Sequence, residues 1–241
     1  RNEGLSRQHN PEFTMLELYQ AYGNCEAMME LIEDLVCTVA EKVIGTLKIQ
    51  HSETKTIDLT RPWKRIPFRD LISWHGGEDW YNVDHADRVE RAKTLGLDVR
   101  DDWSDVEIDT EMYEKLIEPT LMNPTFVTRL PRELVPLAKR CTDDPSLVDV
   151  YELAINGQEI SPGYTELNDP IDQRQRFVEQ LETGDPEEVG DKIDEDFLTA
   201  LEHGMPPAGG LGLGIDRLIM MLTGAENIRE VILFPQMKQK G

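Results

Sequence analysis

The chain has 241 residues, of which 25 are basic and 47 acidic, so its formal net charge is −22. Apolar residues make up 39% and charged residues 30% of the sequence, which supports a folded core and excludes a globally disordered chain. No apolar run reaches the ~18 residues that a transmembrane helix needs. The excess of acid argues against a basic nucleic-acid-binding protein. The length predicts one large domain, alone or with a subdomain.

Cysteine and histidine spacing indicates neither a disulfide framework nor a zinc site. The three cysteines form no C-x-x-C pair, and the five histidines show no H-x-x-x-H spacing. We expect reduced thiols in the core of a cytoplasmic protein. The chain opens on Arg1-Asn2-Glu3-Gly4, without a signal-peptide pattern. We therefore expect it to be the later part of a longer protein.

Residues 13–22 predict a strand with two different faces. Leu16 and Leu18 share one face, which suits a core. The other face places the Glu17 carboxylate between a thioether and aromatic rings; its members are Phe13, Met15, Glu17 and Tyr19. That pattern indicates the wall of a ligand cavity, although half-exposed strands also carry single charges.

Residues 25–44 predict an amphipathic helix that Asn24 caps and Gly45 ends. Its buried stripe is expected to comprise Met29, Ile32, Val36, Val39 and Val43. Residues 55–59 predict a short strand, and Pro67 begins a short helix.

Residues 74–118 are acidic and predict a helical insertion on the surface. Asp84 caps one of its helices, which Gly96 closes. We expect its Asp and Glu side chains to form a solvated face.

The last third of the chain predicts two helices, a loop and a glycine-rich strand. Asp169-Pro170 begins a helix that extends to about residue 181, residues 183–192 form a loop, and residues 197–203 form a helix. Residues 209–214 predict a strand that runs directly into a helix over residues 215–222. Strands and helices without regular βαβ alternation indicate an α+β fold.

A hairpin brings two carboxylates together. Residues 124–128 and 147–155 predict strands, and Asn156-Gly157 after the second is a strong two-residue turn signal. This turn pairs Ala154 with Glu159, so Glu152 shares a face with Glu159 as its diagonal neighbour, roughly 7–8 Å away. The pair favours a Mg²⁺ site. Two side chains that point separately to solvent fit the spacing equally well, and only the further acids Glu166 and Asp169 favour the cation.

Glycines at alternate positions strip one face of the strand over residues 209–214. Without side chains at Gly210, Gly212 and Gly214, a flat ligand can lie against the backbone. Arg217 follows in the first turn of the next helix, where N–H groups already favour an anion. Three features combine here: the opening loop with its arginines Arg1 and Arg7, the paired carboxylates, and this glycine strand with Arg217. Together they indicate nucleotide–Mg²⁺ chemistry at a sheet surface.

Two segments resemble the signature motifs of class II lysyl-tRNA synthetases. Residues 1–4 and 9–19 (RNEG and HNPEFTMLELY) resemble motif 2, and residues 210–217 (GLGLGIDR) resemble motif 3. Matching segments between and after them, in family order, are residues 124–126, 136–140, 165–169 and 231–235. Aspartyl and asparaginyl relatives lack the longer motif 2 string. The resemblance implies an antiparallel sheet flanked by helices, in one partial catalytic domain over residues 1–241.

The resemblance also implies site residues for ATP. Arg1 would contact the α-phosphate of ATP and the amino-acid carboxylate, and Arg217 the γ-phosphate, so both are expected catalytic residues. The remaining ATP-binding residues are expected to be Glu3, His9, Asn10 and Phe13, with Phe13 stacking on adenine.

The same resemblance assigns the lysine and metal sites. Glu17, Tyr19 and Glu166 would hold the lysine side chain, since a buried ammonium needs carboxylates. Glu152 and Glu159 would bind Mg²⁺. The implied partners are ATP, L-lysine and tRNA(Lys), with no membrane, and the full-length protein is expected to be a homodimer.

The chain departs from the family in two ways. Pro162 stands where the family commonly has Asn, so a side-chain amide contact with substrate is lost. Motif 1 and the anticodon-binding domain are expected before Arg1, so the 241 residues alone are expected to have little activity.

Three functions fit these observations. The first is a lysine–tRNA ligase that forms lysyl-adenylate from lysine and ATP. The second is a paralogous lysine ligase that modifies elongation factor P; those relatives tend to have Ala where this chain has Gly212, which favours the tRNA enzyme. The third is a non-catalytic synthetase-like module, against which the retained Arg1, Glu152, Glu159 and Arg217 count.

Overall fold

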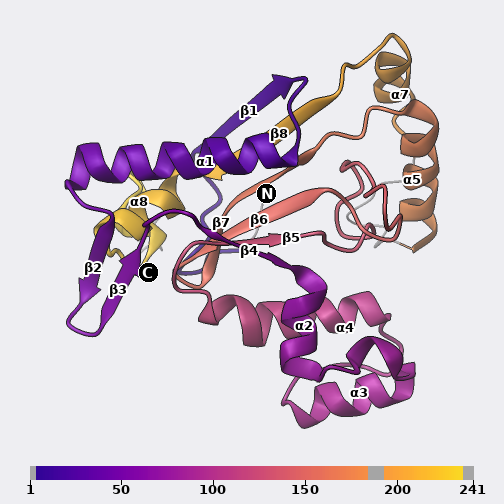
Figure 1. Cartoon of the computed structure of the whole chain (residues 1–241), viewed down its shortest axis with the longest axis horizontal. Helices are drawn as coiled ribbons and strands as arrows, with labels where there is room; N and C mark the ends of the chain where they lie inside the picture. Colours follow the sequence, from indigo (N-terminus) through magenta and orange to yellow (C-terminus); the bar gives the residue numbers. More distant parts are fainter. Residues whose placement is uncertain (1–3, 184–192, 236–241) are drawn as a thin grey trace, which may run out of the picture.

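A six-stranded mixed sheet forms the centre of the molecule (Figure 1). The structure, a computed structural model, describes residues 4–183 and 193–235. The strand order is β1 (Met15–Ala21), β8 (Ala208–Gly214), β7 (Gln158–Thr165), β6 (Val150–Ile155), β5 (Thr125–Thr128) and β4 (Lys64–Pro67). All neighbours are antiparallel except β4 and β5, which are parallel. The sequence did not predict β4, so the expected antiparallel sheet gains one parallel edge strand.

One face of the sheet packs against two helices and a small hairpin. Helices α1 (Cys25–Val39) and α8 (Ile215–Thr223), with strands β2 (Lys48–Ser52) and β3 (Lys55–Asp58), enclose this core. Leu16, Leu18, Leu211 and Leu213 contribute to it from β1 and β8. The predicted inward face of residues 13–22 is therefore confirmed. The short η5 (Ile228–Glu230) follows α8.

The helix over residues 25–44 begins as expected but ends differently. The Asn24 side chain accepts a hydrogen bond from the Ala27 backbone N–H, at an N···O distance of 3.0 Å, and so caps α1. After Val39 the chain forms a π-helical segment, η1 (Ala40–Ile44). The wider π-turn changes the phase of the helix, so Val43 is 71% exposed and the prediction that it is buried was wrong.

Residues 68–120 build a second hydrophobic core, in the lower part of Figure 1. Its helices are α2 (Phe68–Gly76), α3 (His85–Thr94) and α4 (Asp105–Met112), with short segments η2 (Trp80–Asn82), η3 (Tyr113–Ile117) and η4 (Glu118–Thr120). Trp80, Ile108 and Met112 are fully buried, together with Val127 and Val150 of the sheet. The helices predicted for residues 74–118 are present, and Asp84 caps α3.

The acids of this segment are not all solvated. Asp109 is 3% exposed, and its carboxylate accepts hydrogen bonds from Trp80 Nε1 at 2.7 Å and from the Tyr81 hydroxyl at 2.9 Å. A buried carboxylate is tolerated when such donors satisfy it. The expectation of a purely solvated acidic face was therefore wrong at Asp109.

The predicted hairpin is present with the predicted turn. Asn156 and Gly157 have φ values of 62° and 75°, as a type I′ turn requires. Ile155 pairs with Gln158 and Ala154 with Glu159. Beyond this point a β-bulge shifts the register, so that Glu152 lies opposite Pro162.

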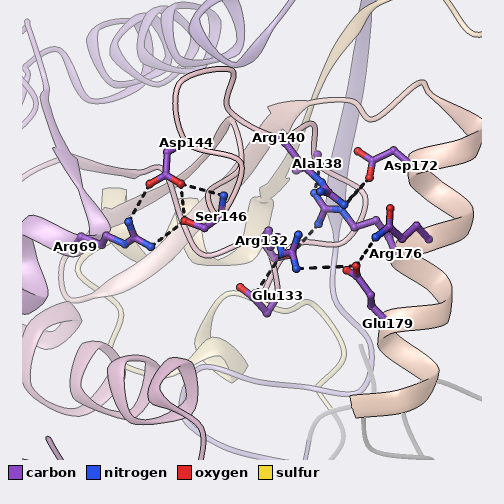
Figure 2. Close-up of polar contacts among 11 residues, drawn as sticks. Arg69, Arg132, Glu133, Ala138, Arg140, Asp144, Ser146, Asp172, Arg176 and Glu179 are labelled. Atoms are coloured by element: carbon purple, nitrogen blue, oxygen red, sulfur yellow. Dashed lines mark hydrogen bonds and ion pairs between the residues drawn. The ribbon is translucent and has the colours of Figure 1, made fainter. Parts of the chain in front are cut away.

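Helix α5 (Pro170–Thr183) lies at the end of the sheet with α7 (Glu195–Glu202). Figure 2 shows the polar contacts that attach α5 to the preceding loop. Arg176 is 2% exposed and donates hydrogen bonds to the backbone oxygens of Arg132 at 2.9 Å and Ala138 at 3.2 Å. Asp172 forms ion pairs with Arg140 at 2.7 Å and with Arg176 at 3.9 Å. The loop predicted at residues 183–192 lies, apart from Thr183, outside the described residues.

Candidate active site

A cavity of about 460 Å³ opens where β1, β7 and the start of α8 meet. Six of the expected binding-site residues line it: His9, Asn10, Phe13, Glu17, Glu159 and Arg217. These residues come from the loop before β1, from β1 itself, from β7 and from α8. The fold therefore brings the expected ATP-binding residues together with one expected lysine-binding and one expected metal-binding carboxylate.

The bare strip of β8 lies beside this cavity. Gly210, Gly212 and Gly214 pair with Tyr19, Glu17 and Met15 of β1, while Leu211 and Leu213 between them are buried. A β-carbon on Gly210 would overlap Glu166 Oε1 and lie 2.9 Å from the Tyr19 ring. Glycine is required here because these side chains approach the backbone closely.

Pro162 lies over the middle of the strip. Its ring atoms are 3.8 and 3.9 Å from the point where a β-carbon on Gly212 would lie, and it lines the cavity. The position that departs from the family pattern therefore faces the candidate site with an apolar ring.

Arg217 is held in place at the beginning of α8. Its guanidinium donates to the Glu159 carbonyl at 2.7 Å and lies 3.0 Å from His9 Nε2. His9 Nδ1 in turn lies 2.9 Å from the Ser6 hydroxyl. A guanidinium in the first turn of a helix, facing a cavity, is well placed to bind a phosphate.

Asp216 is a site residue that the sequence analysis did not assign. It is 7% exposed, and its carboxylate accepts a hydrogen bond from the Thr14 backbone N–H at 2.7 Å. The Ile215 N–H donates to the Thr14 carbonyl at 3.0 Å. These two bonds join the start of β1 to the start of α8, so they set Phe13 relative to Arg217. The adjacent Asp-Arg of the motif was the available signal.

Asn10 and Phe13 line the cavity with a hydrogen-bond acceptor and an exposed aromatic ring. Asn10 is 4% exposed; its amide nitrogen donates to the Glu12 carbonyl at 2.7 Å, and its Oδ1 has no hydrogen-bond partner among residues 4–183 and 193–235. Phe13 is 43% exposed although it is a large apolar ring. A buried unpaired acceptor and a free aromatic face are features that a base with N–H donors can use.

The expected lysine-binding residues gather at the Gly210 end of the strip. Glu166 is 8% exposed, and within the described part of the chain its Oε1 has no hydrogen-bond partner. Burial raises the pKa of Glu166 to about 7. Burial, and then the charges of Glu166 and Glu17, raise the pKa of Tyr19. Within residues 4–183 and 193–235 neither Glu17 nor Glu166 forms an ion pair, and this negative environment suits an ammonium ligand.

Tyr164 belongs to the same group, and the sequence analysis missed it. Burial, followed by the charges of Glu166 and Glu17 and by Tyr19, raises the pKa of Tyr164. It pairs with Gly210 across β7 and β8, opposite Tyr19 on the other side of the strip. The alternation of residues 162, 164 and 166, along β7 and just past its end, was the signal that could have found it.

The two expected metal-binding carboxylates are close neighbours. Burial, and after it the negative charges of Glu159 and Glu118, raise the pKa of Glu152. Burial and then Glu159 raise the pKa of Glu118 to about 7. Among the described residues no group of three or more His, Cys, Asp or Glu side chains is arranged to hold a metal. Two adjacent carboxylates fit a Mg²⁺ ion that takes its remaining ligands from phosphates and water.

Two expected site residues, Arg1 and Glu3, lie outside the described residues. Their assignment to ATP stays a prediction. Glu118 was not predicted at all, since it belongs to the segment that the sequence analysis treated as a surface insertion.

Comparison with known proteins identifies the family. The family model described as tRNA synthetases class II (D, K and N) matches residues 1–238. The chain is 52% identical to the lysine–tRNA ligase of Carboxydothermus hydrogenoformans, 50% to that of Pelotomaculum thermopropionicum and 49% to that of Bacillus subtilis. Each alignment covers 100% of this chain and 48–49% of the relative, so the chain spans about half the length of these proteins. The expected resemblance is thus confirmed, and the chain belongs to the class II aminoacyl-tRNA synthetases of the aspartate, lysine and asparagine group.

Proposed function

We propose that this chain is the part of a lysine–tRNA ligase that activates lysine with ATP. The observation that carries the proposal is the continuous site along β8, with Arg217 and His9 at one end and Glu17, Tyr19 and Glu166 at the other. The lysine–tRNA ligases named above support the same choice of amino acid.

The two ends of the site suit the two ends of the reaction. Gly210 and Gly214 are four residues apart on an extended strand, roughly 13 Å at 3.3 Å per residue. The lysine ammonium would lie near Gly210 against Glu166 and Glu17, and the lysine carboxylate would point toward Arg217. The triphosphate would approach from the α8 end, with adenine against Phe13.

In this arrangement a lysine carboxylate oxygen attacks the α-phosphate of ATP, and pyrophosphate leaves from the opposite side. The P–O bond to pyrophosphate breaks as the bond to lysine forms, which gives lysyl-adenylate. Arg217 would hold the departing phosphates, and the expected role of Arg1 is to bind the α-phosphate. Glu152 and Glu159 would hold Mg²⁺, which when bound neutralises phosphate charge.

The wider partners belong to this proposal. They are ATP, L-lysine and tRNA(Lys), with a homodimer and a cytoplasmic location for the whole protein. No helix within residues 4–183 and 193–235 has the length and hydropathy to cross a membrane. Aminoacylation of tRNA, as opposed to transfer of lysine to a protein acceptor, is decided by offering both acceptors to the enzyme.

The test of the proposed function is lysine-dependent exchange between pyrophosphate and ATP, measured on the complete product of the gene. Arg217→Ala should reduce exchange on the order of 10²-fold, as expected for loss of a group that binds the transferred charge. Arg174→Ala is the matched control, because Arg174 is exposed on α5 and pairs with Glu195 at 2.6 Å. Full activity of Arg217→Ala would contradict the role given to this residue.

A further inference from the structure

Strand β7 carries a proline where it faces the bare strand β8. The two strands pair in register from Gly163 to Thr165, and the pairing stops before Pro162 although both strands continue. Continued by one residue, the register places Pro162 opposite Gly212, the middle glycine of the strip. Because proline has no N–H, this pair lacks one of its hydrogen-bond donors.

The neighbouring hydrogen bonds show which acceptor is left without a donor. The Glu166 N–H donates to the Ala208 carbonyl at 2.8 Å, and in an antiparallel ladder such pairs recur at every second residue. Pro162 and Gly212 lie four residues further along their strands, so they belong to the same set. The residues of β8 between them direct their N–H and C=O groups to the opposite side, towards β1. The Gly212 carbonyl is therefore directed at β7, where a residue other than proline would supply an N–H.

Ser161 supplies a hydrogen bond in its place. Its hydroxyl donates to the Gly212 carbonyl at 2.5 Å, and the residue is fully buried, with 0% of its surface exposed. A buried carbonyl without a donor is costly. The hydroxyl of the residue before the proline therefore does for Gly212 what a backbone N–H would otherwise do.

The proline ring lies on the cavity side of the same pair. Its Cγ and Cδ atoms are 3.8 and 3.9 Å from the position of a β-carbon on Gly212, and Met15 Cε lies 3.1 Å from that position. Met15 and Pro162 both line the cavity. Two apolar groups thus bound the middle of the site, between Glu166 at one end and Arg217 at the other. A methylene chain suits these surroundings better than a polar one.

We propose that Ser161 and Pro162 act together in binding the amino acid: the Pro162 ring packs against the methylene chain of lysine, and the Ser161 hydroxyl replaces the backbone donor that this ring removes. The inference deepens the proposed function and rests on it for the identity of the ligand. Ser161 is a positioning residue, because it is fully buried and acts through the Gly212 carbonyl. It keeps the strand that carries the ring paired with β8.

Pro162→Val separates the two roles, since valine keeps an apolar side chain and restores the N–H. The first measurement is hydrogen exchange of the Gly210 and Gly212 amides, which face β7, in the full protein without substrates. Ser161→Ala should speed this exchange about tenfold in the parent, because the Gly212 carbonyl loses its donor. In a Pro162→Val background the same change should have an effect below about threefold, because the valine N–H takes over. An equal effect in the two backgrounds would overturn the role of Ser161.

The second measurement is the KM for lysine in pyrophosphate exchange. Pro162→Ala removes the ring and should raise this KM about tenfold, with a smaller change in kcat and in the KM for ATP. Pro162→Val should raise it less, because an apolar side chain remains. Ser161→Ala should also raise the KM for lysine, which a purely structural role would leave unchanged. Equal values in Pro162→Ala and Pro162→Val, or an unchanged value in Ser161→Ala, would overturn the proposal.

The two measurements distinguish this proposal from the proposed function. A parent protein without lysine-dependent exchange would contradict the proposed function and, with it, the role of the Pro162 ring. The amide measurement needs no substrate, so it decides independently whether Ser161 takes the place of the missing N–H.

Discussion

Replacing Gly210 by alanine would place a methyl group where Glu166 and Tyr19 meet the backbone. The new β-carbon would overlap Glu166 Oε1 and lie 2.9 and 3.0 Å from two Tyr19 ring atoms. No positive φ is involved at this position, so the effect would come from space alone. Since Glu166 is buried, its carboxylate can relieve the overlap only by leaving its present position.

The size of the effect follows from packing. Overfilling a packed site by one methyl group typically costs about 1–3 kcal/mol. If that strain is relieved by moving Glu166 away from the ammonium position, lysine affinity should fall about tenfold to a hundredfold, at 1.4 kcal/mol per factor of ten. Gly212→Ala is the matched control on the same strand. Its β-carbon would meet only the mobile end of Met15 at 3.1 Å and the Pro162 ring at 3.8 Å.

The assay is lysine binding by calorimetry, together with thermal unfolding of both variants. Gly210→Ala should bind lysine more weakly than the parent and more weakly than Gly212→Ala, whose new methyl group does not displace Glu166. Equal lysine affinity in the two variants would refute the argument, because it would show that the space beside Gly210 is not part of the lysine site.

Three further changes have definite expected outcomes. Burial raises the pKa of Glu166 in the folded protein from 4.5 to about 7, so the stabilisation from its protonated form is complete below about pH 4.5 and is lost as the pH rises through 7. Without lysine, the Glu166→Gln variant should therefore have a higher melting temperature than the parent at pH 8 but not at pH 4. In urea unfolding, Arg176→Leu should cost about 3–5 kcal/mol and the exposed Arg174→Leu less than about 1 kcal/mol; equal losses would contradict the assigned burial. Asp216→Ala should lower the free energy of unfolding by about 1–3 kcal/mol and raise KM for ATP. Asp216→Asn, whose amide oxygen can accept the same hydrogen bond from the Thr14 N–H, should recover most of both; no recovery would show that the negative charge, and not the hydrogen bond, is required.

Local pattern was sufficient for much of the fold. The alternation in residues 13–22 predicted which side of β1 is buried, and the glycines of residues 209–214 predicted a face of β8 without side chains. Asn156-Gly157 predicted both the turn and the first two pairs of the hairpin. Turn chemistry and side-chain period act over a few residues, so they can be read without tertiary information. The same pattern could not show the bulge beyond Ala154, which opposes Glu152 to Pro162.

Local pattern failed where packing between distant segments decides the outcome. Val43 continues the helical period of α1, yet the π-turn exposes it. Asp109 lies in an acidic stretch, yet Trp80 and Tyr81 bury it. Strand β4 was missed because its edge position depends on pairing with β5. In each case the same residues would suit either environment, and the neighbouring segments select one of them.

The sequence by itself determined the faces of β1 and β8, the hairpin turn, and the residue types along the candidate site, because each depends on side-chain spacing within one segment. Only the tertiary structure decided that Asp216 joins β1 to α8. Only it placed Tyr164 opposite Tyr19 across Gly210. Such contacts join segments far apart in the chain, so they depend on how the two cores pack against the sheet and not on any local period.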